Sequence, residues 1–480
     1  MNKTRLLSCT AALFIFSLMP MNANGQSGNT TLDNAVVALE KGDYTTAAKT
    51  FKTLAEHGSA EAQYNLGLCY ANGWGVGLSY IEAAEWLQKA IAQGHKDAEE
   101  SMELLDLGQY GNTTLDSAVI EYKNGRFAAA AVAFKTLAEQ GDAEANYLLG
   151  ICYKNGKGVE QSYTAAAAWY MRAAEKGHTQ AQCTLGDCFR DGKGVPQSDK
   201  DAAEWYTKAA EEGDPDAQYN LGTCYWTGKG VQRSKTKAFT LWQMAAEQGI
   251  SEAQYCIGNC YFTADHVKQS YTDAARLFKE AAEQGHAGAQ CMLGDCYRDG
   301  KGVPQSDDEA MKWYVEAAGQ DDAEAQCRLG NCYRYGKGCQ QSGKEAVKWF
   351  KKAALQGNAE AMCNLGICYK NGEGTQKSME EAISWFSKAA GQDNKEALYN
   401  LGLCHENGWH LEQSYEKAAE LYTQAAKLGE SNAQYSLGLC FVNGWGVEQS
   451  YSEAAEWFRK AAMNGHKEAA ESLELLGIEK

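Results

Sequence analysis

The sequence predicts an all-α solenoid of antiparallel helix pairs, because one short block of residues returns at a fixed interval of 36 residues. The block reads Leu/Ile-Gly-x-Cys-Tyr/Phe/His, and a period of about 20 to 50 residues is typical of repeat architectures. Its glycine occupies positions Gly150, Gly186, Gly222, Gly258, Gly294, Gly330, Gly366, Gly402 and Gly438. One unit cannot bury its apolar face alone, so stacked neighbours form the core and leave a long surface free. The chain holds only four prolines, and no segment has the pattern of a strand.

The first 25 residues predict a secretory signal peptide. Lys3 and Arg5 precede an apolar run over residues 6–19, and Pro20 and the small-residue exit site Ala23-Asn24-Gly25 follow it. The run is too short to span a bilayer, which takes about 20 residues. We therefore expect an exported protein, periplasmic or secreted, or in the secretory lumen of a eukaryote, with no membrane insertion after cleavage.

The net charge is −17 and becomes −19 without Lys3 and Arg5. Such a balance argues against nucleic acid and anionic membranes, whose recognition depends on clustered Lys and Arg. It favours neutral or basic partners, although an acidic surface kept for solubility explains the same charge.

Two arrays are expected after the signal peptide. A tenth block, Leu66–Tyr70, precedes the block at Gly150 by an interval that is not a multiple of the period. The run Gly28–Asp33 returns as Gly111–Asp116 with this same offset. We interpret residues 28–108 as a short array with one full repeat and residues 111–480 as a long array with nine. The pattern leaves open whether the two arrays stack.

Each repeat opens with a helix whose apolar face carries Ala217, Leu221 and Tyr225 in one example. Gly222 lies on this face, where a missing side chain lets a neighbouring helix approach closely. A Gly-x-Gly turn follows and supplies the positive φ angles that end a helix.

The second helix of each repeat begins with a capping pattern such as Ser306 with Glu309. It carries Ala-Ala and then Trp or Leu, and it ends at Ala-Ala-x-x-Gly, a signal for a helix followed by a turn. The Gly-Lys-Gly turns join two helices, so they are not phosphate-binding loops, which join a strand to a helix.

The motif Ala-Gln-Tyr-Asn-Leu-Gly-x-Cys-Tyr, then Gly-x-Gly-Val, then Ala-Ala-x-Trp-Tyr/Phe-x-Lys-Ala-Ala-x-x-Gly resembles the Sel-one-like repeat of the tetratricopeptide clan. The resemblance covers residues 58–108 and 141–480, while segments 32–57 and 115–140 are similar to shortened tetratricopeptide units. It implies a right-handed superhelix with first helices on the concave side, serving as an adaptor that assembles other proteins.

The 16 cysteines after the signal peptide are expected to be buried thiols. Ten lie two residues after the recurring glycine, and equivalent positions in stacked helices are about 8–10 Å apart, beyond the about 7 Å that a disulfide allows. In a cysteine-rich branch of the resembled family a second-helix cysteine bridges to the next unit, but that position here reads Ala-Ala. Cross-repeat pairs such as Cys152 with Cys183 or Cys296 with Cys327 stay open. We expect no metal and no cofactor, because no Cys-x-x-Cys or His-x-x-x-His spacing appears.

Six of the eight histidines fall in turns, and His405 replaces the recurring Tyr. His95, His178, His286 and His466 follow the glycine that ends a second helix. His266 and His410 replace the second glycine of the turn between helices, where the backbone path can differ. A functional role for these two stays a minor hypothesis beside tolerated variation.

Partner-binding residues are expected at positions minus three, plus one and plus four, counted from the recurring glycine. The first two positions lie opposite the core face and line the inner groove, and the third lies at its edge. The candidates are Tyr147, Asp187, Arg190, Tyr219, Tyr255, Asp295, Arg298, Arg334, Ile367, Tyr399, Leu403, Tyr435 and Leu439. The tyrosines could equally pack within the stack, and the arginines could pair with the aspartates.

The sequence favours a non-enzymatic scaffold that binds a protein or peptide in its concave groove, since no catalytic constellation stands out. The alternative is a cell-wall-associated hydrolase or penicillin-binding-type protein of the cysteine-rich branch. An apolar row at Ile367, Leu403 and Leu439 favours the final three repeats as the site. The polar middle of the array, edged by arginines, is the second choice.

Overall fold

The computed structural model describes residues 30–77, 79–104 and 114–475. The predicted signal peptide, residues 1–25, and the predicted boundary between the arrays lie outside these ranges. Within them the chain forms 26 helices, and its one extended pairing is an isolated bridge between Ser79 and Val159. The prediction of an all-α fold of paired helices is confirmed. The chain divides into two compact units, Met1–Ala245 and Ala246–Lys480, which are described separately.

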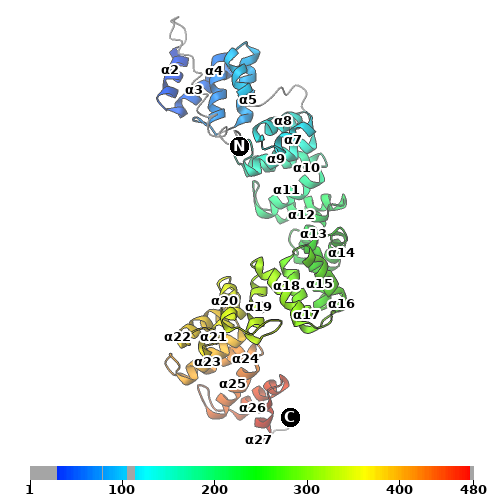
Figure 1. Ribbon diagram of the computed structural model, residues 1–480, viewed down its shortest axis with the longest axis vertical. Coiled ribbons are helices and arrows are strands. Elements are labelled where there is room, and N and C mark those ends of the chain that lie inside the picture. The colour runs from blue at the N-terminus through cyan, green and yellow to red at the C-terminus, as the bar shows by residue number, and fades with distance from the viewer. Residues whose placement is uncertain (1–29, 78, 105–113, 476–480) are drawn as a thin grey trace. The chain divides into compact units, whose positions relative to one another are not determined.

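The first unit follows the order of the chain from blue to green in Figure 1. Its helices are α2 (Thr30–Glu40), α3 (Tyr44–Glu56), α4 (Ala60–Asn72), α5 (Tyr80–Ala92), α6 (Lys96–Leu104), α7 (Leu115–Lys123), α8 (Phe127–Glu139), α9 (Ala143–Asn155), α10 (Tyr163–Glu175), α11 (Thr179–Asp191), α12 (Asp199–Glu211), α13 (Pro215–Thr227) and α14 (Lys235–Glu247).

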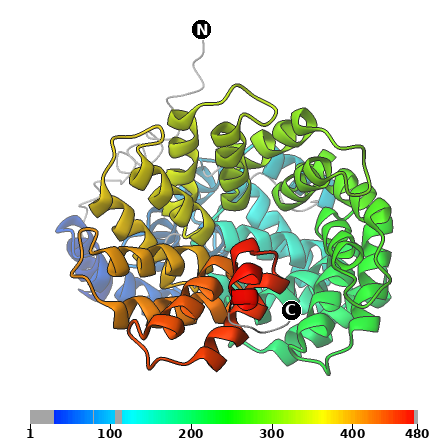
Figure 2. The same ribbon diagram turned by 90° about the horizontal axis from the view of Figure 1, so that it is seen from below.

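The second unit continues with helix pairs that follow one another from green to red in Figure 2. Its helices are α15 (Ser251–Thr263), α16 (Tyr271–Glu283), α17 (Ala287–Asp299), α18 (Asp307–Gly319), α19 (Ala323–Tyr335), α20 (Gly343–Leu355), α21 (Ala359–Asn371), α22 (Met379–Ala390), α23 (Lys395–Asn407), α24 (Tyr415–Lys427), α25 (Ser431–Asn443), α26 (Tyr451–Met463) and α27 (Lys467–Leu475).

The recurring glycine is the contact point of each helix pair, as predicted. A Cβ atom added to Gly330 in α19 would lie 2.5 Å from Cε1 of Phe350 in α20, a ring that is fully buried. An aromatic ring of the second helix therefore occupies the space that the missing side chain leaves. The second helices begin as expected too: the Ser306 hydroxyl accepts the N–H of Glu309 at 3.2 Å.

The turn between the two helices packs on the preceding pair. Gly300 and Gly302 have φ angles of 66° and 76°. A Cβ atom on Gly302 would lie 2.0 Å from the carbonyl oxygen of Tyr271, at the start of the preceding second helix. Glycine is required here both for the left-handed backbone and for the close approach.

All 16 cysteines in the described ranges are free thiols, and most are buried. Loss of solvent contact raises the pKa of Cys404 to about 11 and that of Cys152 to about 12. Thiols with such pKa values are weak nucleophiles at neutral pH. They fill the core as small apolar groups, in agreement with the interpretation preferred from the sequence.

The two arrays pack directly on one another within the first unit. Helix α5 of the short array contacts α8 of the long array, and Ile81 shares a buried cluster with Val132. Lys135 and Glu85 form an ion pair across the same junction. Val132 belongs to the apolar surface with which α8 contacts the short array. The corresponding residue of the short array is the exposed Lys49 of α3. The first helix pair of the short array is therefore polar where the long array is apolar.

A ladder of buried amides runs through both units. Gln290, four residues before the recurring glycine, donates from Nε2 to the carbonyl of Ala282 at 3.2 Å. Its Oε1 accepts from Gln320, which ends the second helix of the same repeat, at 2.8 Å. The same donor and acceptor pairs are Gln93 with Gln63, Gln284 with Gln254, Gln356 with Gln326, and Asn464 with Gln434.

The ladder is broken at Gln182. Its Oε1 is buried without a partner, because the corresponding position at the end of its second helix holds Glu212, whose carboxylate has no N–H to donate. Replacing Glu212 by Gln should supply this donor and raise the free energy of unfolding by about 1 kcal/mol. Urea unfolding monitored by circular dichroism measures the change. Glu211→Gln removes the same charge one residue earlier, and an equal gain in that control would contradict the explanation.

Candidate partner-binding site

The minus-three tyrosines lie against their neighbours in the stack. Tyr147 packs on the His178 ring with centroids 4.7 Å apart, and Tyr255 stacks on His286 at the same distance. Tyr435 stacks on His466 at 4.4 Å, and Tyr399 lies 5.7 Å from the Tyr422 ring. Tyr219 is also half-buried, and its carbonyl accepts from Trp242. These contacts support the packing alternative, and a direct role of the tyrosines in binding stays a prediction.

Two of these histidines, His178 and His286, are helix caps, a role that the sequence pattern did not reveal. Nδ1 of His178 accepts the N–H of Ala181 at 3.1 Å. Its Nε2 then carries the proton and donates to Glu144 of the preceding repeat at 2.7 Å. His286 caps α17 in the same way, with 3.0 Å to the N–H of Ala289. Each histidine therefore joins two consecutive repeats.

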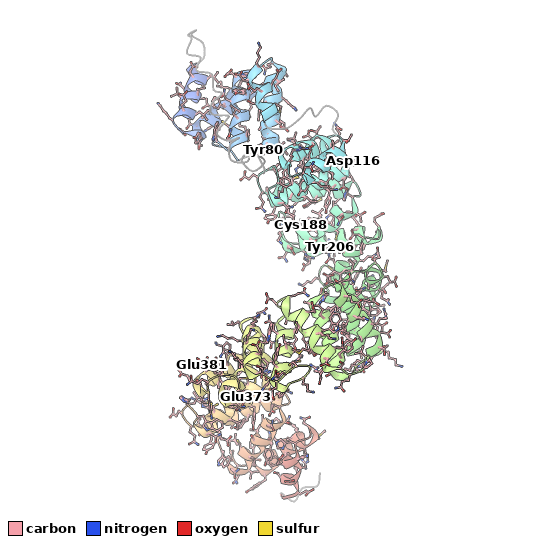
Figure 3. All side chains as sticks on the ribbon, viewed as in Figure 1. Tyr80, Asp116, Cys188, Tyr206, Glu373 and Glu381 are labelled. Atoms are coloured by element: carbon pink, nitrogen blue, oxygen red, sulfur yellow. The ribbon has the colours of Figure 1, made fainter. Side chains whose placement is uncertain are left out.

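The plus-one aspartates pair with the plus-four arginines, as the alternative interpretation expected. Arg190 lies 2.8 Å from Asp187, and Arg298 lies 2.6 Å from Asp295. The hydroxyl of Tyr206, labelled in Figure 3, donates to Asp187 at 2.8 Å. Asp187 and Arg190 therefore neutralise one another in the absence of a partner.

The apolar row is less exposed than the sequence suggested. Ile367, Leu403 and Leu439 are all partly buried, and each packs against a core cluster. They contact the core because neighbouring helices also cover the face of the first helix that lies beside its Ala, Leu and Tyr residues. These side chains keep only part of their surface exposed, and their role in binding stays a prediction.

A pocket of about 380 Å³ lies in the second unit. It brings together two of the predicted residues, Arg298 and Arg334, with Arg328, which was not predicted. Its walls come from α17, α18, α19, α21 and α23, so three consecutive repeats and the start of a fourth contribute. The other predicted residues do not line it.

Arg328 is the centre of the charged network at this pocket. Its Nη1 donates to both carboxylate oxygens of Glu360 at 3.0 Å, and its Nε lies 3.4 Å from Asp295. Glu324, one turn earlier on the same helix, also pairs with it. Asp295 thus lies between two guanidinium groups, those of Arg298 and Arg328.

Arg334 is fixed by side chains of the following repeat. Its Nε donates to Glu373 at 2.8 Å, and its Nη1 donates to the amide oxygen of Asn364 at 3.3 Å. Burial raises the pKa of Glu373, but hydrogen bonds from Asn371 and Arg334 outweigh it, so the pKa lies below its usual value. Glu373, labelled in Figure 3, is ionised at neutral pH and pairs with the arginine.

The bond from Arg334 to Asn364 belongs to a recurring pattern. Lys370 donates to Asn400 at 2.7 Å, and Arg190 donates to Asn220 at 3.4 Å, each joining a plus-four cation to the minus-two position of the next repeat. Arg328 occupies this minus-two position in its own repeat, where every other repeat has an uncharged residue. This charge was the sequence signal that could have located the site.

No group of three or more His, Cys, Asp or Glu side chains in the described ranges is arranged to hold a metal ion. No helix in the part of the chain that the structure describes is both long enough and apolar enough to cross a membrane.

Stacked helix pairs with a charged pocket spanning several of them define an α-helical repeat solenoid. The family comparison matches the Sel1 repeat, and the chain belongs to this family. The matched residues are 60–95, 143–178, 179–214, 215–250, 251–286, 287–322, 323–358, 359–394, 395–430 and 431–466. The resemblance noted in the sequence is confirmed, with all ten repeats.

Solved structures of the same family resemble the chain. One is c5321, a protective antigen present in uropathogenic Escherichia coli strains, with 31% identity, a TM-score of 0.65, and coverage of 88% of this chain and 89% of that chain. A Sel1 repeat protein from Oxalobacter formigenes is 32% identical, with a TM-score of 0.47, and the match covers 51% of this chain and 96% of that chain. A comparison with curated proteins found no match.

Proposed function

We propose that the protein is a non-enzymatic scaffold that binds a protein or peptide partner on the face formed by the first helices of the second unit. The observation that carries the proposal is the pocket beside Arg328, which spans three consecutive repeats of a Sel1 solenoid. Repeat solenoids of this type are typical of protein–protein interaction. A site built from several repeats suits an extended ligand, because each repeat adds contacts along its length.

The test is capture from an exported fraction, followed by mass spectrometry of the bound proteins. Asn331, at the plus-one position of its repeat, lines the pocket, and Asn331→Trp should fill it without changing the charge. Asn259→Trp places the same bulk at the same position of another repeat, where no pocket residue lies. We expect Asn331→Trp to lose the partner and Asn259→Trp to keep it, with similar thermal midpoints. Capture that survives in both variants would reject this site.

The alternative function is a hydrolase that acts on cell-wall material. Assays of the purified chain for amide hydrolysis and for peptidoglycan binding distinguish it from the scaffold. If the protein is a scaffold, we expect no turnover by the unmodified chain and none by the Asn331→Trp variant. Robust hydrolysis by the unmodified chain would reject it.

We also propose that the protein is exported, supported by the charged, apolar and small-residue regions of residues 1–25. Expression of the full chain, followed by fractionation and intact-mass measurement, is the test. We expect a product that begins near Gln26 in the exported fraction. An uncleaved product that stays with the cytosol would overturn the proposal.

A further inference from the structure

We propose that the pocket binds an acidic peptide segment of the partner, whose carboxylates replace Glu360 and Glu373 on Arg328 and Arg334. The inference rests on the proposed function and specifies the chemistry of the ligand. It follows from three features of the pocket: buried arginines, carboxylate partners that can move away, and an internal carboxylate whose geometry a ligand can reproduce.

The arginines are the fixed part of the site. The side chains of Arg334 and Arg328 are only 13% and 21% exposed. Arg334 is oriented by Asn364 on the next first helix, and Arg328 by the well-buried Asp295. Each guanidinium group therefore keeps at least one other partner when its outer carboxylate leaves, Asn364 for Arg334 and Asp295 with Glu324 for Arg328, and this preorganisation favours binding.

The outer carboxylates are the exchangeable part. Glu373 and Glu360 are 37% and 42% exposed, about twice the exposure of their arginine partners or more. Water can hydrate these exposed carboxylates when they turn away, and each arginine keeps another hydrogen-bond or ion-pair partner. The repeat fold does not require an acidic residue at the position of Glu373, the middle residue of the turn between helices, because five of the ten turns carry lysine there.

The internal partners indicate the chemistry of the ligand. Glu360 places both carboxylate oxygens at 3.0 Å from one nitrogen of Arg328, so the site already accommodates a carboxylate. The pocket lining has four cationic and three acidic side chains, and Asp295, Glu324 and Glu373 pair with its arginines from outside the lining. A ligand carboxylate therefore takes the place of an internal one and does not meet unpaired positive charge, in a chain with a net charge of −17. That overall charge repels long polyanions such as nucleic acid, whereas a short acidic segment can meet the local cations.

The test uses fluorescence anisotropy with dye-labelled oligoglutamate and oligolysine peptides and the complete exported chain. We expect Arg334→Gln to weaken oligoglutamate binding about tenfold, since it removes a charged hydrogen-bond donor. Glu373→Gln should instead tighten binding about threefold, because it weakens the internal competitor. Both substitutions break the same ion pair, so a purely structural role would move binding in one direction.

The matched control is Arg276 with Glu280, an exposed pair on α16 with a distance of 2.7 Å that lies away from the pocket. Arg276→Gln and Glu280→Gln should leave oligoglutamate binding unchanged. Equal binding of oligolysine, or the same direction of change for Arg334→Gln and Glu373→Gln, would overturn the inference. Preferential binding of inorganic phosphate at Arg334 would overturn the choice of a carboxylate ligand. A partner captured equally well by Arg334→Gln would reject this chemistry and leave the scaffold proposal standing.

Discussion

Replacing Gly330 by alanine is expected to lower the free energy of unfolding by about 2–3 kcal/mol, the cost of overpacking a tight core. Alanine normally stabilises a helix interior relative to glycine by about 1 kcal/mol. Here the new methyl group would lie 2.5 Å from the buried Phe350 ring, whose neighbours leave no room to retreat. Steric overlap with a fixed aromatic ring therefore outweighs the helical preference.

The control for this prediction is Gly319→Ala in α18. Gly319 lies at the end of a second helix, and an added Cβ atom would meet nothing within 4 Å. We expect it to stabilise by about 0.5–1 kcal/mol. The measurement is the urea midpoint by circular dichroism, because long repeat arrays depart from two-state unfolding. If Gly330→Ala does not lower the urea midpoint, then α19 and α20 can move apart without losing stability, which would contradict this prediction.

Substitutions at two equivalent turn positions, Gly446 and His410, should change stability in opposite directions. Gly446 has a φ angle of 68°, and a Cβ atom there would lie 2.1 Å from the Tyr415 carbonyl oxygen. Gly446→Ala adds backbone overlap to left-handed strain and should destabilise by more than about 2 kcal/mol. His410 occupies the same turn position in the preceding repeat with a φ angle of 53°. His410→Gly should relieve roughly 1–2 kcal/mol of strain.

Thermal unfolding of the two variants measures the effect. We expect the midpoint of Gly446→Ala to fall and that of His410→Gly to rise. If His410→Gly lowers the midpoint, then the imidazole contributes contacts that outweigh its backbone strain, and the hypothesis of a role for this histidine gains support.

The sequence predicted the fold well because repetition multiplies each signal. Gly222 alone is a weak indication, but the same glycine in every repeat identifies the helix contact. The capping serines and the Gly-x-Gly turns gain weight in the same way. Even so, the buried amide ladder escaped notice, since the partners of Gln290 are 8 and 30 residues away and belong to different helices.

The site was predicted only in part. Arg298 and Arg334 were chosen because they recur at one position, and both line the pocket. Arg328 was missed because a search for recurrence overlooks a residue that departs from the pattern. The exposure of Leu403 was misjudged because a helical wheel gives a direction but no distance to the neighbouring helices that cover a side chain.

The pairing of minus-three residues with helix caps has a consequence for how such an array can change during evolution. A minus-three tyrosine is followed 31 residues later by a histidine in four of six repeats and by Ile250 or Glu430 in the other two, whereas all four minus-three cysteines are followed by Asp or Asn. These pairs are Tyr64 with His95, Tyr147 with His178, Tyr255 with His286, Tyr435 with His466, Cys183 with Asp214, Cys291 with Asp322, Cys327 with Asn358, and Cys363 with Asn394. Both members of each pair lie within one matched repeat, so a unit gained or lost between two matched repeats carries its pair along unchanged. Only a break inside a repeat can join a tyrosine to an aspartate, and the boundary between matched repeats is therefore the place where the array can lengthen or shorten without creating a new combination at these two positions.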